Sequence, residues 1–89
     1  MMDYEWDWRK SRENEAKHGV SIMYVIDIWL NWVLTMPSRR KGENRKLSIG
    51  VIAGEYWIVI WESKGESRRI ISARRSTIKE MALYDRNNI

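Results

Sequence analysis

Three runs of apolar and β-branched residues, separated by two short glycine-containing links, constrain the fold of this chain more than any other feature. Residues 45–53 alternate between apolar and polar side chains, and residues 56–61 and 68–73 also have the composition of strands. The links at 54–55 and 64–65 are tight-turn sequences, and links this short join antiparallel neighbours. The runs therefore predict three adjacent strands of one sheet, with 56–61 central because it is apolar on both faces.

Two helices are expected before these strands and one after them. Asp7 is suited to be the N-cap of a first helix that ends at Gly19, a residue that favours the left-handed C-terminal cap. Ser21 can cap a second, short helix, although the β-branched residues of 21–28 are also compatible with a strand. Thr77 begins the last helix, and the glutamate three residues later completes a capping box.

The remaining apolar run, residues 29–36, ends at a proline and adds one more strand. The order is then two helices, four strands and one helix, which predicts an α+β fold with a largely antiparallel sheet in a single domain of residues 1–89. Trp57 and Trp61 share a strand face with Val59, so we expect them in the core rather than stacked on nucleobases.

Charge and composition narrow the possible partners and sites. The net charge is −2 for residues 1–27 and +6 for the rest of the chain. A basic region of this kind suits a polyanion or an acidic partner, but its lysines and arginines could equally serve only to keep the strands solvated. There is no cysteine and His18 is the only histidine, which argues against disulfides and zinc sites. The longest apolar stretch, 20–34, is short for a membrane span and contains Asp27 and Asn31, so we expect a soluble cytoplasmic protein without membrane contact.

Several common catalytic motifs are missing from the sequence. It contains no phosphate-binding loop, no His-x-x-x-His pair and no serine-centred nucleophile motif. Cationic and polar side chains on the strands and the last helix remain as the candidates. Such groups are compatible with metal-free RNA cleavage, in which a base takes the 2′-hydroxyl proton, an acid protonates the 5′-oxygen and fixed cations stabilise the transition state.

Several short blocks of sequence follow one another in order along the chain. They are Tyr4-Glu5-Trp6-Asp7, Asn14, Lys17-His18-Gly19-Val20-Ser21, Glu43-x-Arg45 and Arg69-Ile70-Ile71-Ser72-Ala73-Arg74, with Glu80 and Tyr84 in the last helix. Together these blocks resemble the signature of the BrnT toxins, and the resemblance spans nearly the whole chain. It implies a RelE-like fold, a ribonuclease that arrests translation and growth, and neutralisation by a DNA-binding BrnA-type antitoxin, through which alone the chain would contact DNA.

Two segments depart from this family pattern. The loop Ser38-Arg39-Arg40-Lys41 is basic where acidic residues with a histidine are usual, and Ile22-Met23-Tyr24 stands where acidic residues usually follow the serine. These differences bear on substrate preference and antitoxin fit more than on the fold.

Four residues are candidates for catalysis. Arg45 and Arg74 lie at strand edges and suit phosphate oxygens, with an ion pair to a nearby glutamate as the structural alternative. His18 can act as general acid or base. The structural alternative is that its positive charge interacts favourably with the helix dipole at the C-terminus of the first helix. Tyr84, one helical turn after Glu80, can act on the RNA or simply pack.

Further cations are candidates for binding the RNA. They are Lys17, Arg69, Arg39, Arg40 and Lys41. The loop cations can guide either RNA or the antitoxin electrostatically. No cofactor or metal is expected, because no carboxylate cluster has the spacing of a Mg²⁺ site. The competing interpretation is a non-catalytic module that binds nucleic acid or protein through the same basic surface.

Overall fold

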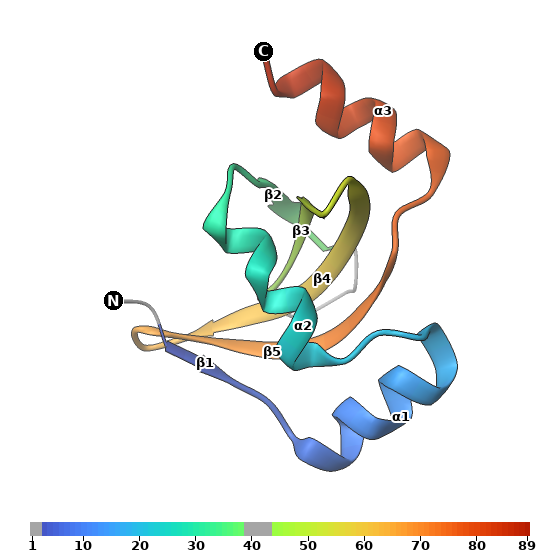
Figure 1. The fold of residues 1–89 in the computed structure, drawn as a ribbon. Helices are drawn as coiled ribbons and strands as arrows, with labels where there is room; N and C mark the ends of the chain where they lie inside the picture. The colour runs from blue at the N-terminus through green and yellow to red at the C-terminus, as the bar shows by residue number, and fades with distance from the viewer. Residues whose placement is uncertain (1–2, 39–43) are drawn as a thin grey trace.

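The computed structural model describes residues 3–38 and 44–89. Its sheet has five strands in the order β1-β5-β4-β3-β2 (Figure 1). The strands are β1 (Asp3–Glu5), β2 (Leu34–Pro37), β3 (Arg45–Ile52), β4 (Glu55–Lys64) and β5 (Ser67–Arg75). The helices are α1 (Trp8–His18), α2 (Ile22–Val25), the 3-10 helix η1 (Ile26–Leu30) and α3 (Ile78–Asn87). The predicted α+β class is confirmed.

One strand of the sheet was not predicted. Strands β2 to β5 pair antiparallel, as expected, but β1 pairs parallel with β5, with Tyr4 opposite Arg68. The prediction of four strands is therefore wrong by one. Three residues are too few for a periodic pattern, and β1 is stabilised by distant partners such as Arg69, which donates to Glu5 at 3.2 Å.

The other differences are at the boundaries of elements. The run 29–36 becomes a strand only at Leu34, because residues 29–30 continue η1. The turn of the first hairpin is at Ala53-Gly54, one residue earlier than expected, with φ of 51° and 80° at the two positions. Positive φ at both central residues gives a two-residue turn the twist that antiparallel strands need. The turn of the second hairpin lies one residue later than predicted, at residues 65–66 instead of 64–65.

The predicted helix ends are confirmed by their caps. The Asp7 side chain accepts from the backbone N–H of Arg9 at 2.8 Å, and Gly19 ends α1 with a φ of 74°. Ser21 caps α2, so residues 22–30 form a short α-helix followed by a 3-10 turn rather than a strand. Thr77 caps α3 in a complete capping box.

The helices α2 and η1 cover one face of the sheet. Val25 and Ile28 pack there against Val59 in the main core, together with Trp57 and Trp61, which are 3% and 6% exposed. The predicted burial of both tryptophans is confirmed. A Cβ atom at the neighbouring position 50 would collide with the Ile28 side chain, so the glycine there allows η1 to approach the sheet.

The helix α3 covers only part of the opposite face. Its Tyr84 packs on Ile49 and Ile58, which form a smaller second core. Figure 1 shows α3 and α1 at opposite ends of the molecule, so α3 does not reach the part of the sheet beside α1. None of the helices formed by residues 3–38 and 44–89 combines the length and apolar character needed to cross a membrane.

Candidate active site

An open hollow of about 710 Å³ occupies the part of the sheet face that α3 leaves uncovered. Its lining combines side chains from α1, β3, β4 and β5 with Ser38, which follows β2. The lining residues are Lys10, Glu13, Asn14, Lys17, His18, Ser38, Arg45, Leu47, Ile60, Ile71, Ser72 and Arg74. Among the residues that the structure describes, the hollow therefore has an aliphatic floor and a rim with four cationic side chains.

The floor follows from the register of the strands. Leu47 on β3 lies opposite Ile60 on β4, and Ile60 lies opposite Ser72 on β5. The pairing between β4 and β5 shifts at Ile60 and Trp61, which leaves Ile71 as the extra residue of a bulge. These side chains are half-buried, so they offer apolar surface that is still accessible from the hollow.

Arg74 reaches the rim from the end of β5 and is held by Glu80. Its Nη1 and Nη2 atoms donate to the two carboxylate oxygens of Glu80, each at 2.8 Å. The contact raises the pKa of Arg74 and lowers that of Glu80, because it stabilises both charged forms. The ion pair considered as the structural alternative for Arg74 is thus present, while the arginine still lines the hollow.

Arg45 enters the hollow from the first position of β3. It lies opposite Glu62 on β4, and its side chain is half-buried. It also lines a second hollow of about 600 Å³ with Lys46 and Asn44, and the two hollows meet at Arg45 and Ser38. Its expected alternative partner, Glu43, lies outside the described residues.

One face of α1 forms the opposite rim. Lys10, Glu13 and Lys17 are spaced three and four residues apart, so they share a side of the helix. Asn14 on the same side is buried and links α1 to the neighbouring segments, donating to the Val20 carbonyl at 3.1 Å and accepting from the Ala73 N–H at 3.0 Å.

The structure brings together four of the predicted site residues, Lys17, His18, Arg45 and Arg74. Arg69 is not among them, because it lies opposite Glu62 on β4 and pairs with Glu5 at 3.2 Å and with Glu62 at 3.8 Å. The loop cations at 39–41 lie outside the described residues.

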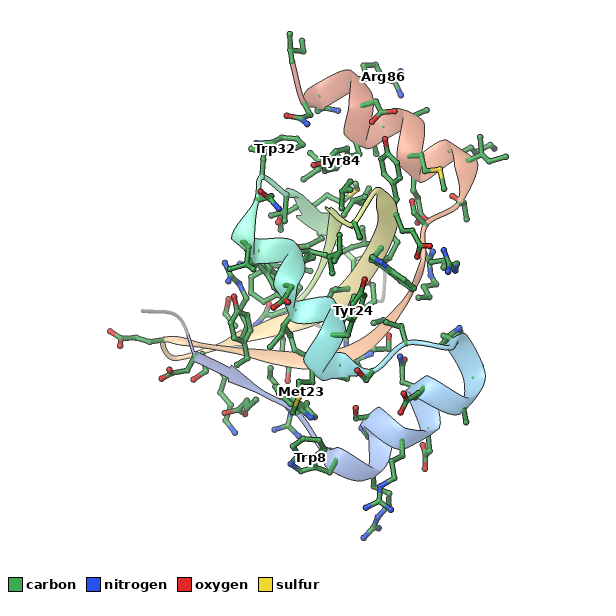
Figure 2. All side chains as sticks on the ribbon, in the orientation of Figure 1. Trp8, Met23, Tyr24, Trp32, Tyr84 and Arg86 are labelled. Atoms are coloured by element: carbon green, nitrogen blue, oxygen red, sulfur yellow. The ribbon has the colours of Figure 1, made fainter. Side chains whose placement is uncertain are left out.

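Tyr84 is likewise placed away from the hollow. The residue is 6% exposed, and its hydroxyl donates to the Trp32 carbonyl at 3.1 Å; Figure 2 shows the two residues facing each other beneath α3. Burial raises the pKa of this phenol. The geometry therefore favours packing, the alternative considered for Tyr84, over a direct action on RNA.

Sequence reasoning missed several residues of the lining. Lys10 and Glu13 were counted only in the net charge of residues 1–27. Their spacing relative to Lys17 nevertheless indicates that the three residues share a helix face. Ser38 gave no such signal, because only the approach of the end of β2 to β3 brings it to the hollow. Glu13 is the only carboxylate side chain of this lining, as far as residues 3–38 and 44–89 describe it.

Within the described part of the chain, no three His, Cys, Asp or Glu side chains come together as a group that could hold a metal ion. The chemistry of the donors in the hollow instead suits an anion. Its lining carries guanidinium and ammonium groups, which bind anions. The helix α1 adds the imidazole of His18 and the carboxylate of Glu13 beside them.

A comparison with protein-family models matches residues 6–80 to BrnT_toxin, described as the ribonuclease toxin, BrnT, of type II toxin-antitoxin system. The matched residues contain the whole rim and floor of the hollow, together with Glu80. No curated protein matches the chain.

Proposed function

Because this chain belongs to the BrnT family of ribonuclease toxins of type II toxin–antitoxin systems, we propose that it cleaves RNA in the hollow between α1 and the open sheet face, without a metal ion. The observation that carries the proposal is the meeting of Arg45 and Arg74, from two strands, with Lys17 and His18, from the end of a helix. These elements are distant in sequence, and each contributes a group that metal-free cleavage requires.

The reaction is an in-line transfer within the RNA. The 2′-oxygen attacks the adjacent phosphorus, the bond from phosphorus to the 5′-oxygen breaks, and the products are a 2′,3′-cyclic phosphate and a 5′-hydroxyl end. Negative charge spreads over the phosphoryl oxygens in the transition state. Arg45 and Arg74 stabilise it, since a guanidinium can meet two oxygens at once.

The proton transfers are assigned to α1. Among the described residues of the lining, Glu13 supplies a carboxylate and His18 an imidazole, and groups of both kinds serve as general bases and acids. A carboxylate is suited to take the 2′-hydroxyl proton, and an imidazolium is suited to give a proton to the departing 5′-oxygen. Lys10 and Lys17 flank Glu13 on the helix and attract the neighbouring phosphates.

The aliphatic floor favours single-stranded RNA as the substrate. A base that leaves its helical stack can lie on Leu47, Ile60 and Ile71, whereas a paired base cannot reach them. The adjoining hollow at Arg45 and Ser38 extends the path for the same strand beyond the cleaved position.

The family implies a cognate antitoxin and an RNA substrate. A BrnA-type protein is the antitoxin that fits a chain of this kind, and its release would free the ribonuclease to arrest translation and growth in the cytoplasm.

The decisive experiment incubates the purified chain with single-stranded RNA in excess EDTA. We expect cleavage to proceed and to leave 2′,3′-cyclic phosphate ends. Activity that EDTA abolishes and Mg²⁺ restores would refute the metal-free mechanism. RNA that is bound but never cut would favour the non-catalytic binding module.

A further inference from the structure

The guanidinium of Arg74 leaves one of its edges unused among the described residues. An arginine has five N–H donors. Nη1 donates to Glu80 at 2.8 Å and to the Arg75 carbonyl at 3.1 Å, and Nη2 donates to Glu80 at 2.8 Å. The Nε–H and the second N–H of Nη2 find no acceptor among the residues that the structure describes.

These two remaining donors have a geometry suited to phosphate. Glu80 takes the end of the fork, where Nη1 and Nη2 point the same way. The Nε–H and the outer N–H of Nη2 form the other parallel pair of the planar group, and such a pair can meet two oxygens of one phosphate. Arg74 also lines the hollow, whereas Glu80 is not among the residues of its lining.

Glu80 is itself fixed by the first turn of α3. Its Oε1 accepts from the backbone N–H of Thr77 at 2.8 Å, and its own N–H donates to the Thr77 hydroxyl at 3.2 Å. The Glu80 side chain is only 20% exposed. The same carboxylate therefore completes the helix cap and holds both terminal nitrogens of Arg74, so the guanidinium plane is set by a helix rather than by a flexible side chain.

We propose that Glu80 is a positioning residue of the ribonuclease, which holds Arg74 so that its Nε and Nη2 edge faces the scissile phosphate. The inference rests on the proposed function of the hollow. A donor that is already oriented needs no reorganisation as charge develops, and this is the source of most of its effect on rate. The tethered arginine should thus act mainly on kcat and only weakly on KM.

The structure offers a matched pair of variants for the test. Glu80→Gln keeps an oxygen that can cap the Thr77 N–H, but it replaces one acceptor of the Arg74 fork by an amide donor. Thr77→Ala does the opposite, because it removes the hydroxyl half of the capping box and leaves the fork intact. Cleavage kinetics and thermal melts are measured for both and for wild type.

We expect Glu80→Gln to lower kcat by about 10- to 100-fold with KM within about threefold, and Thr77→Ala to lower the melting temperature while kcat stays near wild type. In the Arg74→Ala background, Glu80→Gln should have no further effect on kcat. Normal kcat in Glu80→Gln, an equal loss in Thr77→Ala, or an undiminished effect in the Arg74→Ala background would each overturn the proposal.

A second measurement applies even where Glu80→Gln is too unstable to assay. Added guanidinium ion should partly restore cleavage by Arg74→Ala, because the Glu80 carboxylate can hold the ion in the vacated place. The rescue should be absent in Arg74→Ala combined with Glu80→Ala, and equal rescue in both variants would overturn the proposal. A wild-type chain that cuts no RNA would instead refute the proposed function itself, a result seen before any variant is compared.

Discussion

Asn14 replaces a neighbouring strand at the outer edge of β5, where its side-chain oxygen accepts from the Ala73 N–H at 3.0 Å and its amide donates to Val20 at 3.1 Å. The side chain is buried, so losing it leaves two backbone groups without partners.

We expect Asn14→Leu to lower the free energy of unfolding by about 2–4 kcal/mol, with both backbone groups contributing. The variant should also cleave RNA more slowly, because α1 carries Lys17 and His18. Urea denaturation checks this, with Asn87→Ala, an exposed asparagine, as the control; equal stability of the two variants would contradict the prediction.

The two arginines of the hollow should each be needed for cleavage. Arg45→Ala and Arg74→Ala are expected to lose about 10²–10³ in rate, as is common for one charge-stabilising group. Lys79→Ala removes an exposed cation of α3 that does not line the hollow, so it should retain wild-type rates. Cleavage assays and circular dichroism melts give the comparison, and full activity in both arginine variants would remove them from the site.

The assignment of Glu13 and His18 to the proton transfers predicts that cleavage needs both side chains. We expect Glu13→Gln and His18→Gln each to lower the cleavage rate by about 10²–10⁴, the usual contribution of a positioned general acid or base. Cleavage assays beside circular dichroism melts make the measurement. Full activity in both variants would rule out this pair.

Glu80 should contribute to stability in a defined range of pH. Its pKa in the folded protein is lowered from 4.5, chiefly by the hydrogen bonds from Arg74, so its contribution is complete above about pH 4.5 and is lost as the pH falls through the lowered value. The melting temperature should therefore fall less steeply below about pH 4.5 in Glu80→Gln than in wild type. Parallel slopes would show that the ion pair adds nothing to acid stability.

Expression of the chain alone should arrest bacterial growth. The family is one of ribonuclease toxins, and the effect should depend on the hollow. We expect Arg74→Ala, at equal soluble expression, to restore growth. Growth curves with matched immunoblots make the measurement, and unimpaired growth with the wild-type chain would argue for the binding-module alternative.

Much of the site lay beyond what local sequence could predict. The motif blocks pointed to Lys17, His18, Arg45 and Arg74, and the structure places these four in one hollow. Tyr84 fitted the same pattern equally well, yet its hydroxyl bonds to the Trp32 carbonyl, 52 residues earlier in the chain. Sequence spacing reports which residues share a helix face, but not what that face packs against.

The parts of this protein whose energetics are local could be predicted from the sequence. The caps at Asp7, Gly19 and Thr77 and the antiparallel hairpins follow from hydrogen bonds and turn conformations within a few residues. The parallel pairing of β1 with β5 and the approach of α1 to Ala73 depend on tertiary contacts, because they join residues about 60 positions apart. Such contacts form only once the sheet exists, so neither the fifth strand nor the position of α1 against β5 has a signature in the chain alone.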